Sequence, residues 1–316
     1  MDPREVRVVF MGSPAFAVPS LRALVAGKYN VIGVVTQPDR PSGRGGAIHA
    51  PDVKVAAREL DIQVFQPETF RDEEARQRLQ AFSADLFVVA AYGKILSRAV
   101  LSMPARGCVN VHASLLPRWR GASPIAAAIL SGYTEAGVSI MEMDVRMDAG
   151  AVIAQRSVTI RPDDTTGELE VKLAALGADL LVEVLPDWYD RRSEAVPQDE
   201  SLVTSCHTLS KEDGHLRVTM TAAEAERAVR SSNPWPGAYV EYRGQRLGIW
   251  RAHPVNAEET GKPGSTAIIE KTPAVAFAGG WLVLDEVQRV GSKRLPGGAF
   301  LNGERGQLAP EVGLRD

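Results

Sequence analysis

Short apolar runs alternate with amphipathic stretches through the first half of the chain, and this alternation constrains the fold more than any other feature. The predicted strands of this half are 6–11, 31–35, 63–65, 86–90 and 108–111. Most of them are apolar at consecutive positions, which is typical of a parallel sheet covered by helices on both faces. Helical patterns lie between them, one ending at Gly27 and two more at 52–60 and 72–82. We therefore predict an α/β fold with a doubly wound, mostly parallel, Rossmann-like sheet.

After residue 190 the pattern changes to closely spaced short strands. A polar stretch at 191–205 is predicted to be a linker, and one helical segment follows at 222–230. The later predicted strands are 238–242, 247–251, 266–270, 274–278 and 281–287. Short strands separated by glycine-containing turns are typical of a small β-barrel. Because 316 residues are enough for about two domains, we expect one domain at 1–190 and a second at 206–316.

Composition and charge exclude several classes of protein. Hydrophobic residues make up 45% of the chain and charged residues 24%, as in an ordinary folded domain. The net charge of −3 gives no overall attraction to a polyanion, so a nucleic acid would have to bind at local patches. The two cysteines are far apart, and the five histidines form no helical pair, so neither a disulfide framework nor a metal site is predicted. The longest apolar run, 86–92, is far too short to span a membrane, and we expect a soluble cytoplasmic protein.

Two turns after predicted strands are candidate binding elements. The first contains only Gly12, so the three-glycine dinucleotide fingerprint is missing and a nicotinamide cofactor is disfavoured. The second, 37–46, is longer than most connections of this kind and places Arg40 and Arg44 among prolines and glycines. A long basic loop can reach phosphate groups. The alternative is a flexible surface loop with solvated charges.

The densest group of polar candidates follows the strand at 108–111. Asn110 and His112 are two residues apart, so their side chains point to the same side of the strand, near its carboxyl end where open α/β sheets bind ligands. An amide donor can stabilise an oxyanion while an imidazole moves protons, which suits acyl or formyl transfer. Asp148 could orient His112 or a water molecule, whereas Asp144 is interpreted as a turn residue. The alternative is a capping asparagine and a core histidine.

Together these motifs are similar to those of the folate-dependent formyltransferase superfamily. The similarity is carried by Asn110-x-His112, by Ser114-Leu115-Leu116-Pro117 directly after it, and by Asp148. It extends to 37–45, 91–93, 118–121, 233–239 and 291–294, and covers nearly the whole chain. Over this larger set of motifs, the chain resembles those members of the superfamily that formylate an aminoacylated initiator tRNA.

The resemblance implies a reaction and a set of site residues. The formyl donor would be 10-formyltetrahydrofolate and the acceptor the α-amino group of methionyl initiator tRNA, with no metal and no NAD. Asn110, His112 and Asp148 would be catalytic. The residues implied to line the folate site are Ala91, Tyr92, Gly93, Ser114, Leu115, Leu116 and Pro117. Those implied to contact tRNA are Arg40, Arg44, Lys293 and Arg294, the last two on a C-terminal domain that resembles an OB-like barrel.

Two rival functions remain open from the sequence. A formyltransferase acting on a sugar nucleotide or on glycinamide ribonucleotide would share the catalytic residues, and the loop at 37–45 and the long C-terminal region argue against it. A non-catalytic RNA-binding protein could retain a relic Rossmann domain, but it would have no need for Asn110, His112 and Asp148 together. No membrane partner and no obligate protein partner are inferred.

Overall fold

The computed structural model describes residues 2–42, 47–257 and 261–316. The chain divides into two compact units. The first contains Met1–Pro124, Ala136–Val158 and Glu170–Cys206, and the second contains Ile125–Glu135, Thr159–Leu169 and His207–Asp316. Two short segments that precede residue 170 therefore belong to the second unit. Hydrogen bonds within that unit show why, because Thr166 Oγ1 donates to the Ser231 carbonyl and Arg227 Nε to the Leu130 carbonyl.

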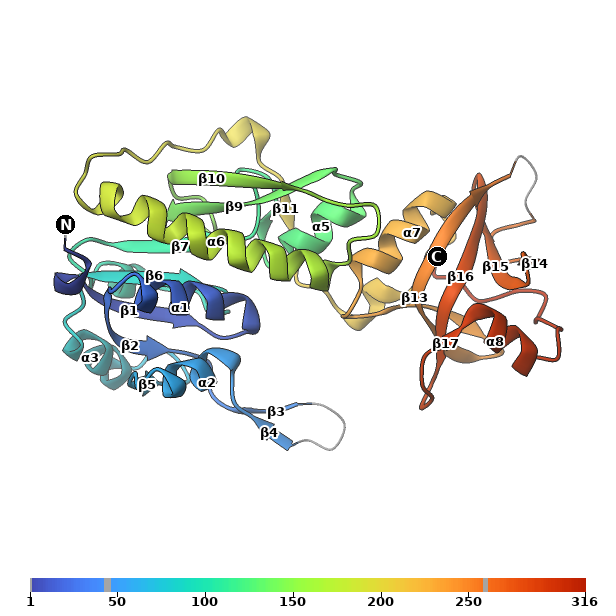
Figure 1. Cartoon of the computed structure of the whole chain (residues 1–316), viewed down its shortest axis with the longest axis horizontal. Coiled ribbons are helices and arrows are strands. Elements are labelled where there is room, and N and C mark those ends of the chain that lie inside the picture. Colours follow the sequence, from blue (N-terminus) through green and yellow to red (C-terminus); the bar gives the residue numbers. More distant parts are fainter. Residues whose placement is uncertain (1, 43–46, 258–260) are drawn as a thin grey trace. The chain divides into compact units, whose positions relative to one another are not determined.

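The main sheet has seven strands in the order β10-β9-β7-β6-β1-β2-β5 (Figure 1). Its strands are β1 (Arg7–Gly12), β2 (Asn30–Val35), β5 (Val64–Phe65), β6 (Leu86–Ala90), β7 (Cys108–His112), β9 (Glu135–Glu142) and β10 (Val152–Thr159). The pairs β1–β2, β1–β6, β2–β5 and β6–β7 are parallel, whereas β7 and β9 are antiparallel. The prediction of a mostly parallel, Rossmann-like sheet is confirmed. The strands β9 and β10 were not predicted from the sequence.

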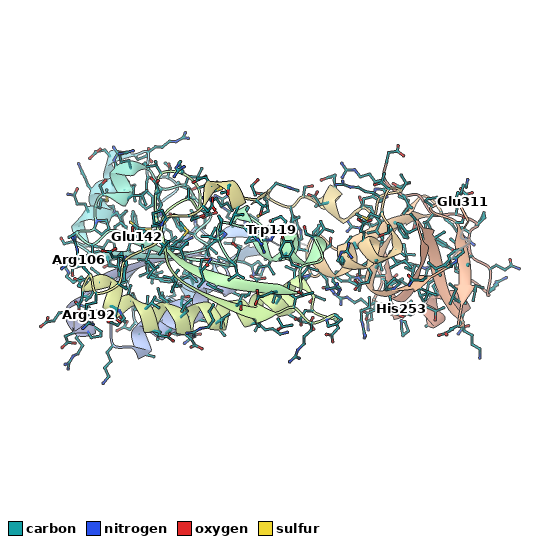
Figure 2. The ribbon with its side chains drawn as sticks, turned by 90° about the horizontal axis from the view of Figure 1, so that it is seen from above. Arg106, Trp119, Glu142, Arg192, His253 and Glu311 are labelled. Carbon is teal, nitrogen blue, oxygen red and sulfur yellow. The ribbon has the colours of Figure 1, made fainter. Side chains whose placement is uncertain are left out.

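Helices connect and cover these strands. They are α1 (Val18–Ala26), α2 (Asp52–Glu59), α3 (Glu73–Ala81), α4 (Arg98–Leu101) and α6 (Thr166–Tyr189). A further helix, α5 (Pro124–Leu130), belongs to the second unit except for Pro124. Gly177 of α6 lies close to the sheet, since a Cβ atom there would be 2.7 Å from Val111 of β7 and 3.2 Å from Val138 of β9. At the C-terminal end of α6, the Trp188 indole donates to Glu142 and Arg106 stacks on Tyr189; Figure 2 labels Arg106 and Glu142. These contacts fix α6 against the strands that carry the site.

Two small ladders lie outside the main sheet. Strands β3 (Arg40–Ser42) and β4 (Ala47–His49) pair antiparallel at the predicted long loop. Strands β8 (Arg120–Gly121) and β11 (Ser205–Cys206) pair in parallel, which joins the end of the predicted linker to the segment after Pro117. Short 3-10 turns occur at Pro3–Glu5, Ala15–Ala17, Glu200–Leu202 and Lys211–Gly214.

The second unit is built on an antiparallel sheet with the order β12-β13-β16-β15-β14, and β17 pairs with β16. Its strands are β12 (Ala238–Tyr242), β13 (Gln245–Asn256), β14 (Thr266–Ile269), β15 (Thr272–Phe277), β16 (Gly280–Arg289) and β17 (Leu295–Pro296), with helices α7 (Ala222–Ser231) and α8 (Gly297–Gly303). Gly313 bridges to Glu241 of the edge strand β12, and Glu311 bridges to Ser265 beside β14 at the opposite edge. The end of the chain thus covers both sheet edges, which would otherwise expose unpaired backbone groups. The small β-barrel of short strands predicted for the C-terminal region is confirmed as an antiparallel β domain. Among the described helices, none is both long and apolar enough to cross a membrane.

Candidate functional site

Asn110 and His112 lie on β7, in the interior of the first unit. Their exposed fractions are 8% and 6%. Strand β7 is held between β6 and β9, so its backbone hydrogen bonds fix both residues, and the strand ends at His112. The described residues offer the Asn110 side-chain amide no hydrogen-bond partner. Among the described residues, the fully buried side-chain polar atoms without a partner belong to Ser20, Tyr29 and Tyr92, so the Asn110 amide keeps some access to solvent and can bind a polar ligand group.

The His112 imidazole lies between two acceptors. Its Nε2 is 3.1 Å from the Trp119 carbonyl oxygen, and its Nδ1 is 3.7 Å from Oδ1 of Asp148. A carbonyl oxygen only accepts hydrogen bonds, so Nε2 carries a proton in this arrangement. The other ring nitrogen, Nδ1, faces the Asp148 carboxylate, so the imidazole is oriented from both sides.

Asp148 reaches His112 from the connection between β9 and β10. Its other carboxylate oxygen, Oδ2, accepts a hydrogen bond from the Gly121 backbone N–H at 2.9 Å. The backbone of Asp148 is left-handed, with φ of 50°, a conformation that aspartate tolerates better than most residues. The structure thus brings the three predicted catalytic residues together, with Asn110 and His112 buried and Asp148 half-buried.

The segment from Ser114 to Gly121 supplies the backbone groups that contact this cluster. Ser114 Oγ donates to the Arg118 carbonyl at 2.6 Å, and Ser139 Oγ both donates to the Ser114 carbonyl and accepts from the Leu116 N–H. Gly121 has a φ of 119°, and a Cβ atom there would be 2.2 Å from the Cys206 carbonyl oxygen. Only glycine fits at this position, where the Gly121 N–H meets Asp148.

The residues expected to line a folate site differ in their exposure. Ala91 and Gly93 are exposed, and both have a left-handed backbone. The Tyr92 side chain between them packs against Phe70 in the core, and burial raises the pKa of its phenol. Its carbonyl accepts hydrogen bonds from Ser13 Oγ and Gln37 Nε2.

The second predicted folate segment shows the same alternation. Ser114 and Leu116 are buried, whereas Leu115 and Pro117 are half-buried. The side chains of Tyr92, Ser114 and Leu116 are thus buried, and the accessible surface of the two segments comes from the residues between them.

The predicted tRNA contacts are distributed over both units. Arg40 is exposed on β3, and the neighbouring Asp39 is held by the nearly buried Lys54 at 2.6 Å. Arg44 lies outside the described residues. In the second unit Lys293 is exposed, and the Arg294 guanidinium lies 3.6 Å from the centre of the Trp250 ring. Stacking of this kind holds a cation at a defined place on the surface.

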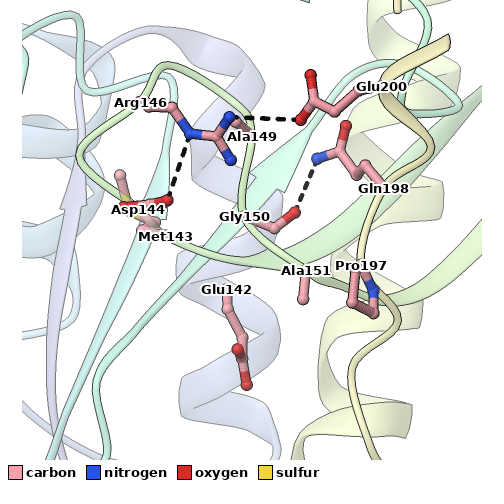
Figure 3. Close-up of a pocket in the computed structure, with 10 residues that line it drawn as sticks. All are labelled: Glu142, Met143, Asp144, Arg146, Ala149, Gly150, Ala151, Pro197, Gln198 and Glu200. Carbon is pink, nitrogen blue, oxygen red and sulfur yellow. Dashed lines mark hydrogen bonds and ion pairs between the residues drawn. The ribbon is translucent and has the colours of Figure 1, made fainter. Parts of the chain in front are cut away.

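A polar cavity of about 310 Å³ lies beside the connection that carries Asp148 (Figure 3). It is lined by residues 142–144, 146, 149–151, 197, 198 and 200. Arg146 is 3.7 Å from Asp144 and 3.5 Å from Glu200, so the charged side chains that line the cavity form ion pairs with one another. A hydrogen bond from Arg120 holds the pKa of the Glu200 carboxyl below its ordinary value. No group of three or more metal-binding side chains occurs among the residues with described positions.

Sequence reasoning missed several groups that hold the cluster together. The Trp119 carbonyl and the Gly121 N–H are backbone groups, and only their place in the similar string at 118–121 marked them. Gln198, whose side chain donates to the carbonyls of Asp148 and Gly150, falls in the stretch predicted to be a linker. Nothing in that polar stretch indicated a contact with the site.

Comparison with known proteins agrees with the site. The formyl transferase family matches residues 6–185, and the C-terminal domain of formyl transferases matches residues 208–305. A methionyl-tRNA formyltransferase of Chloroflexus aggregans is 45% identical over 313 residues, which is 98% of this chain and 100% of the relative. One of Methylococcus capsulatus is 46% identical over 94% of this chain and 96% of its own.

A solved structure shows the same fold at low sequence identity. It is WlaRD, a sugar 3N-formyl transferase crystallised with dTDP and 5-N-formyl-THF, with a TM-score of 0.65 and 15% identity over 91% of this chain and 99% of that one. The resemblance proposed from the sequence motifs is confirmed by the family match and by the two close relatives. The chain belongs to the formyl transferase family, and the relatives that it matches over almost their full length are methionyl-tRNA formyltransferases.

Proposed function

We propose that this protein transfers the formyl group of 10-formyltetrahydrofolate to the α-amino group of methionyl initiator tRNA. The observation that carries this proposal is the cluster of Asn110, His112 and Asp148 in a chain that is 45% identical to a methionyl-tRNA formyltransferase over nearly its full length. The cluster supplies an oxyanion donor and a proton carrier, which are the two functions that formyl transfer to an amine requires.

The reaction proceeds by direct transfer between the two substrates. The neutral methionyl amine attacks the formyl carbon, and the carbonyl oxygen becomes an oxyanion as the new C–N bond forms. The Asn110 amide donates to this oxyanion, and the neutral His112 imidazole takes the proton that the amine loses, so the imidazolium that forms also stabilises the oxyanion. The bond between the formyl carbon and the folate nitrogen then breaks. The proton lost by the amine passes through His112 to the departing nitrogen, while Asp148 keeps the imidazole oriented and balances its charge. No electron pair moves to a redox partner, so NAD has no part in this chemistry.

The folate would bind at the carboxyl ends of β6 and β7. Ala91 and Gly93 are the exposed residues of the loop after β6, and Leu115 and Pro117 are the accessible residues of the loop after β7. The buried side chains of Tyr92, Ser114 and Leu116 would set the shape of these loops. Open α/β sheets bind ligands at this edge, because the loops of adjacent parallel strands meet there.

The acceptor RNA would be held by basic residues on both units. Arg40 and Arg44 would contact phosphates from the loop between β2 and α2, and Lys293 and Arg294 from the domain that we place at 206–316. With a net charge of −3 for the chain, such binding must rely on local patches. Charged initiator tRNA is a cytoplasmic substrate, so we place the protein in the cytoplasm.

Acceptor competition tests the proposal. Purified protein is given 10-formyltetrahydrofolate with methionyl initiator tRNA, an amino-sugar nucleotide or glycinamide ribonucleotide. We expect formylation of the tRNA with a rate constant, kcat/KM, that exceeds the other two by several orders of magnitude and falls as salt is raised. Preferred formylation of either small amine would overturn the proposal and favour the small-substrate formyltransferases.

A further inference from the structure

The segment at 197–206 contacts the two loops that surround His112. Residues 197–206 belong to the first unit, and their side chains and backbone bond to both loops that contact His112. Gln198 Nε2 donates to the Asp148 carbonyl at 2.8 Å and to the Gly150 carbonyl at 2.7 Å; Figure 3 draws the second of these bonds. The Gln198 amide oxygen accepts from Arg120 Nε at 3.0 Å. One amide thus joins the loop of Asp148 to the loop of Trp119.

Thr204 makes the matching contact on the other loop. Its Oγ1 accepts the Trp119 backbone N–H at 2.9 Å, and its backbone carbonyl accepts the Arg120 N–H at 2.9 Å. The Thr204 N–H donates to the Pro117 carbonyl. Trp119 is therefore held on one side by Thr204 and presents its carbonyl to His112 Nε2 on the other.

The two groups that face His112 belong to residues with a left-handed backbone conformation. Trp119 has a φ of 59° and Asp148 a φ of 50°. A bulky residue such as tryptophan rarely adopts a left-handed conformation unless neighbouring contacts impose it. The residues that bond to these two left-handed positions are Thr204, at Trp119, and Gln198, at Asp148.

We propose that Gln198 and Thr204 are positioning residues for formyl transfer, acting on His112 through Asp148 and Trp119 respectively. The inference rests on the proposed function only in taking His112 as the group that moves the proton. Proton transfer requires the donor and acceptor within hydrogen-bond reach, and a misplacement of about 1 Å can lower a rate about 100-fold. Loss of one of two supports should shift the cluster by less than that.

Gln198→Glu is the first test. The variant keeps an oxygen for Arg120 and loses the N–H donor to Asp148 and Gly150. We expect the single-turnover rate at saturating substrates to fall about tenfold, with unchanged KM values for folate and tRNA.

Thr204→Val, which removes the acceptor of the Trp119 N–H without changing the side-chain shape, should lower the rate by a similar factor. Thr204→Ser keeps the hydroxyl and should retain the wild-type rate. Glu200→Gln is the matched control, because Glu200 also binds Arg120 but touches neither Asp148 nor Trp119; it should keep the wild-type rate.

A double variant separates positioning from general destabilisation. If Gln198 acts through Asp148, then Gln198→Glu should cost less than twofold when Asp148 is already asparagine. A full tenfold loss in that background, or a wild-type rate in both Gln198→Glu and Thr204→Val, would overturn the inference. The wild-type acceptor assay is run first. If that assay shows a small amine as the acceptor, the proposed function fails. The same variants are then assayed with that amine, so a failure of the proposed function is distinguished from a failure of the positioning role.

Discussion

Replacing Asp148 by asparagine should remove most of the catalytic proton transfer while leaving the fold in place. The carboxylate is 3.7 Å from His112 Nδ1, and the exposed fractions of the two side chains are 7% for His112 and 17% for Asp148. At an effective dielectric constant of about 20, two unit charges at this distance attract by about 4 kcal/mol. Asparagine keeps an oxygen for the Gly121 N–H but provides no charge for the imidazolium. Because about 1.4 kcal/mol corresponds to a factor of ten, the full loss would be about 1,000-fold.

Some of that loss is recovered when water reaches the neutral side chain, so we expect the Asp148→Asn rate to be about 100- to 1,000-fold below wild type. Single-turnover formylation with enzyme in excess of methionyl-tRNA is the appropriate assay, since it measures chemistry without product release. Asp144→Asn is the control, because this carboxylate lies on the same connection, is half-exposed and pairs with Arg146. A rate within threefold of wild type for Asp148→Asn would refute the electrostatic role of Asp148.

Three further predictions concern other parts of the chain. Burial raises the pKa of the Cys108 thiol to about 12, so its reactive thiolate is scarce at pH 8. Peptide mass analysis should therefore find the half-buried Cys206 alkylated first in the native protein, and Cys108 alkylated only on unfolding. Rapid labelling of Cys108 in the native protein would contradict this. Hydrogen bonds from Gln66 and Lys54 hold the pKa of the Asp39 carboxyl below its ordinary value. Ionised Asp39 therefore stabilises the fold fully at a pH above the ordinary carboxyl pKa. This stabilisation is lost progressively as the pH falls through the lowered pKa of the folded protein. The difference in melting temperature between wild type and Asp39→Asn should therefore be larger at pH 6 than at pH 3, and the opposite order would show that the ion pair does not stabilise the fold. Arg44→Ala and Arg294→Ala should each raise KM for charged tRNA, leave folate affinity unchanged and reduce the slope of log affinity against log salt by about one unit; an unchanged slope in both would remove these residues from the RNA contact.

The first half of the fold was predictable because its strands are buried on both faces. The strand at 108–111 was recognised from its apolar residues, and the alternation of side chains then placed Asn110 and His112 on one side. The structure has that strand at Cys108–His112, with both residues buried. Local pattern and tertiary environment agree here, so little beyond the sequence was needed.

The contacts around His112 could not be predicted in the same way. Asp148 meets His112 only because β9 pairs with β7, and neither β9 nor β10 was identified. The Trp119 carbonyl is a backbone group, whose contacts depend on the path of the chain rather than on the type of side chain. Gln198 and Thr204 lie in a polar stretch that has the composition of a linker, although its backbone pairs with Arg120 and Gly121. Composition indicates exposure, and it carries no information about which backbone groups a polar segment will bind.

The central claim is that Asn110 and His112 perform the formyl transfer, and the single-turnover rate of their alanine variants tests it most directly. With 10-formyltetrahydrofolate and methionyl initiator tRNA at saturation, His112→Ala should reduce the rate at least about 100-fold, because the proton carrier is lost. Asn110→Ala should reduce it by a similar factor through loss of the oxyanion donor. Both variants should bind folate and tRNA with wild-type affinity. A near-normal single-turnover rate in His112→Ala would contradict the account and place the chemistry elsewhere in the molecule.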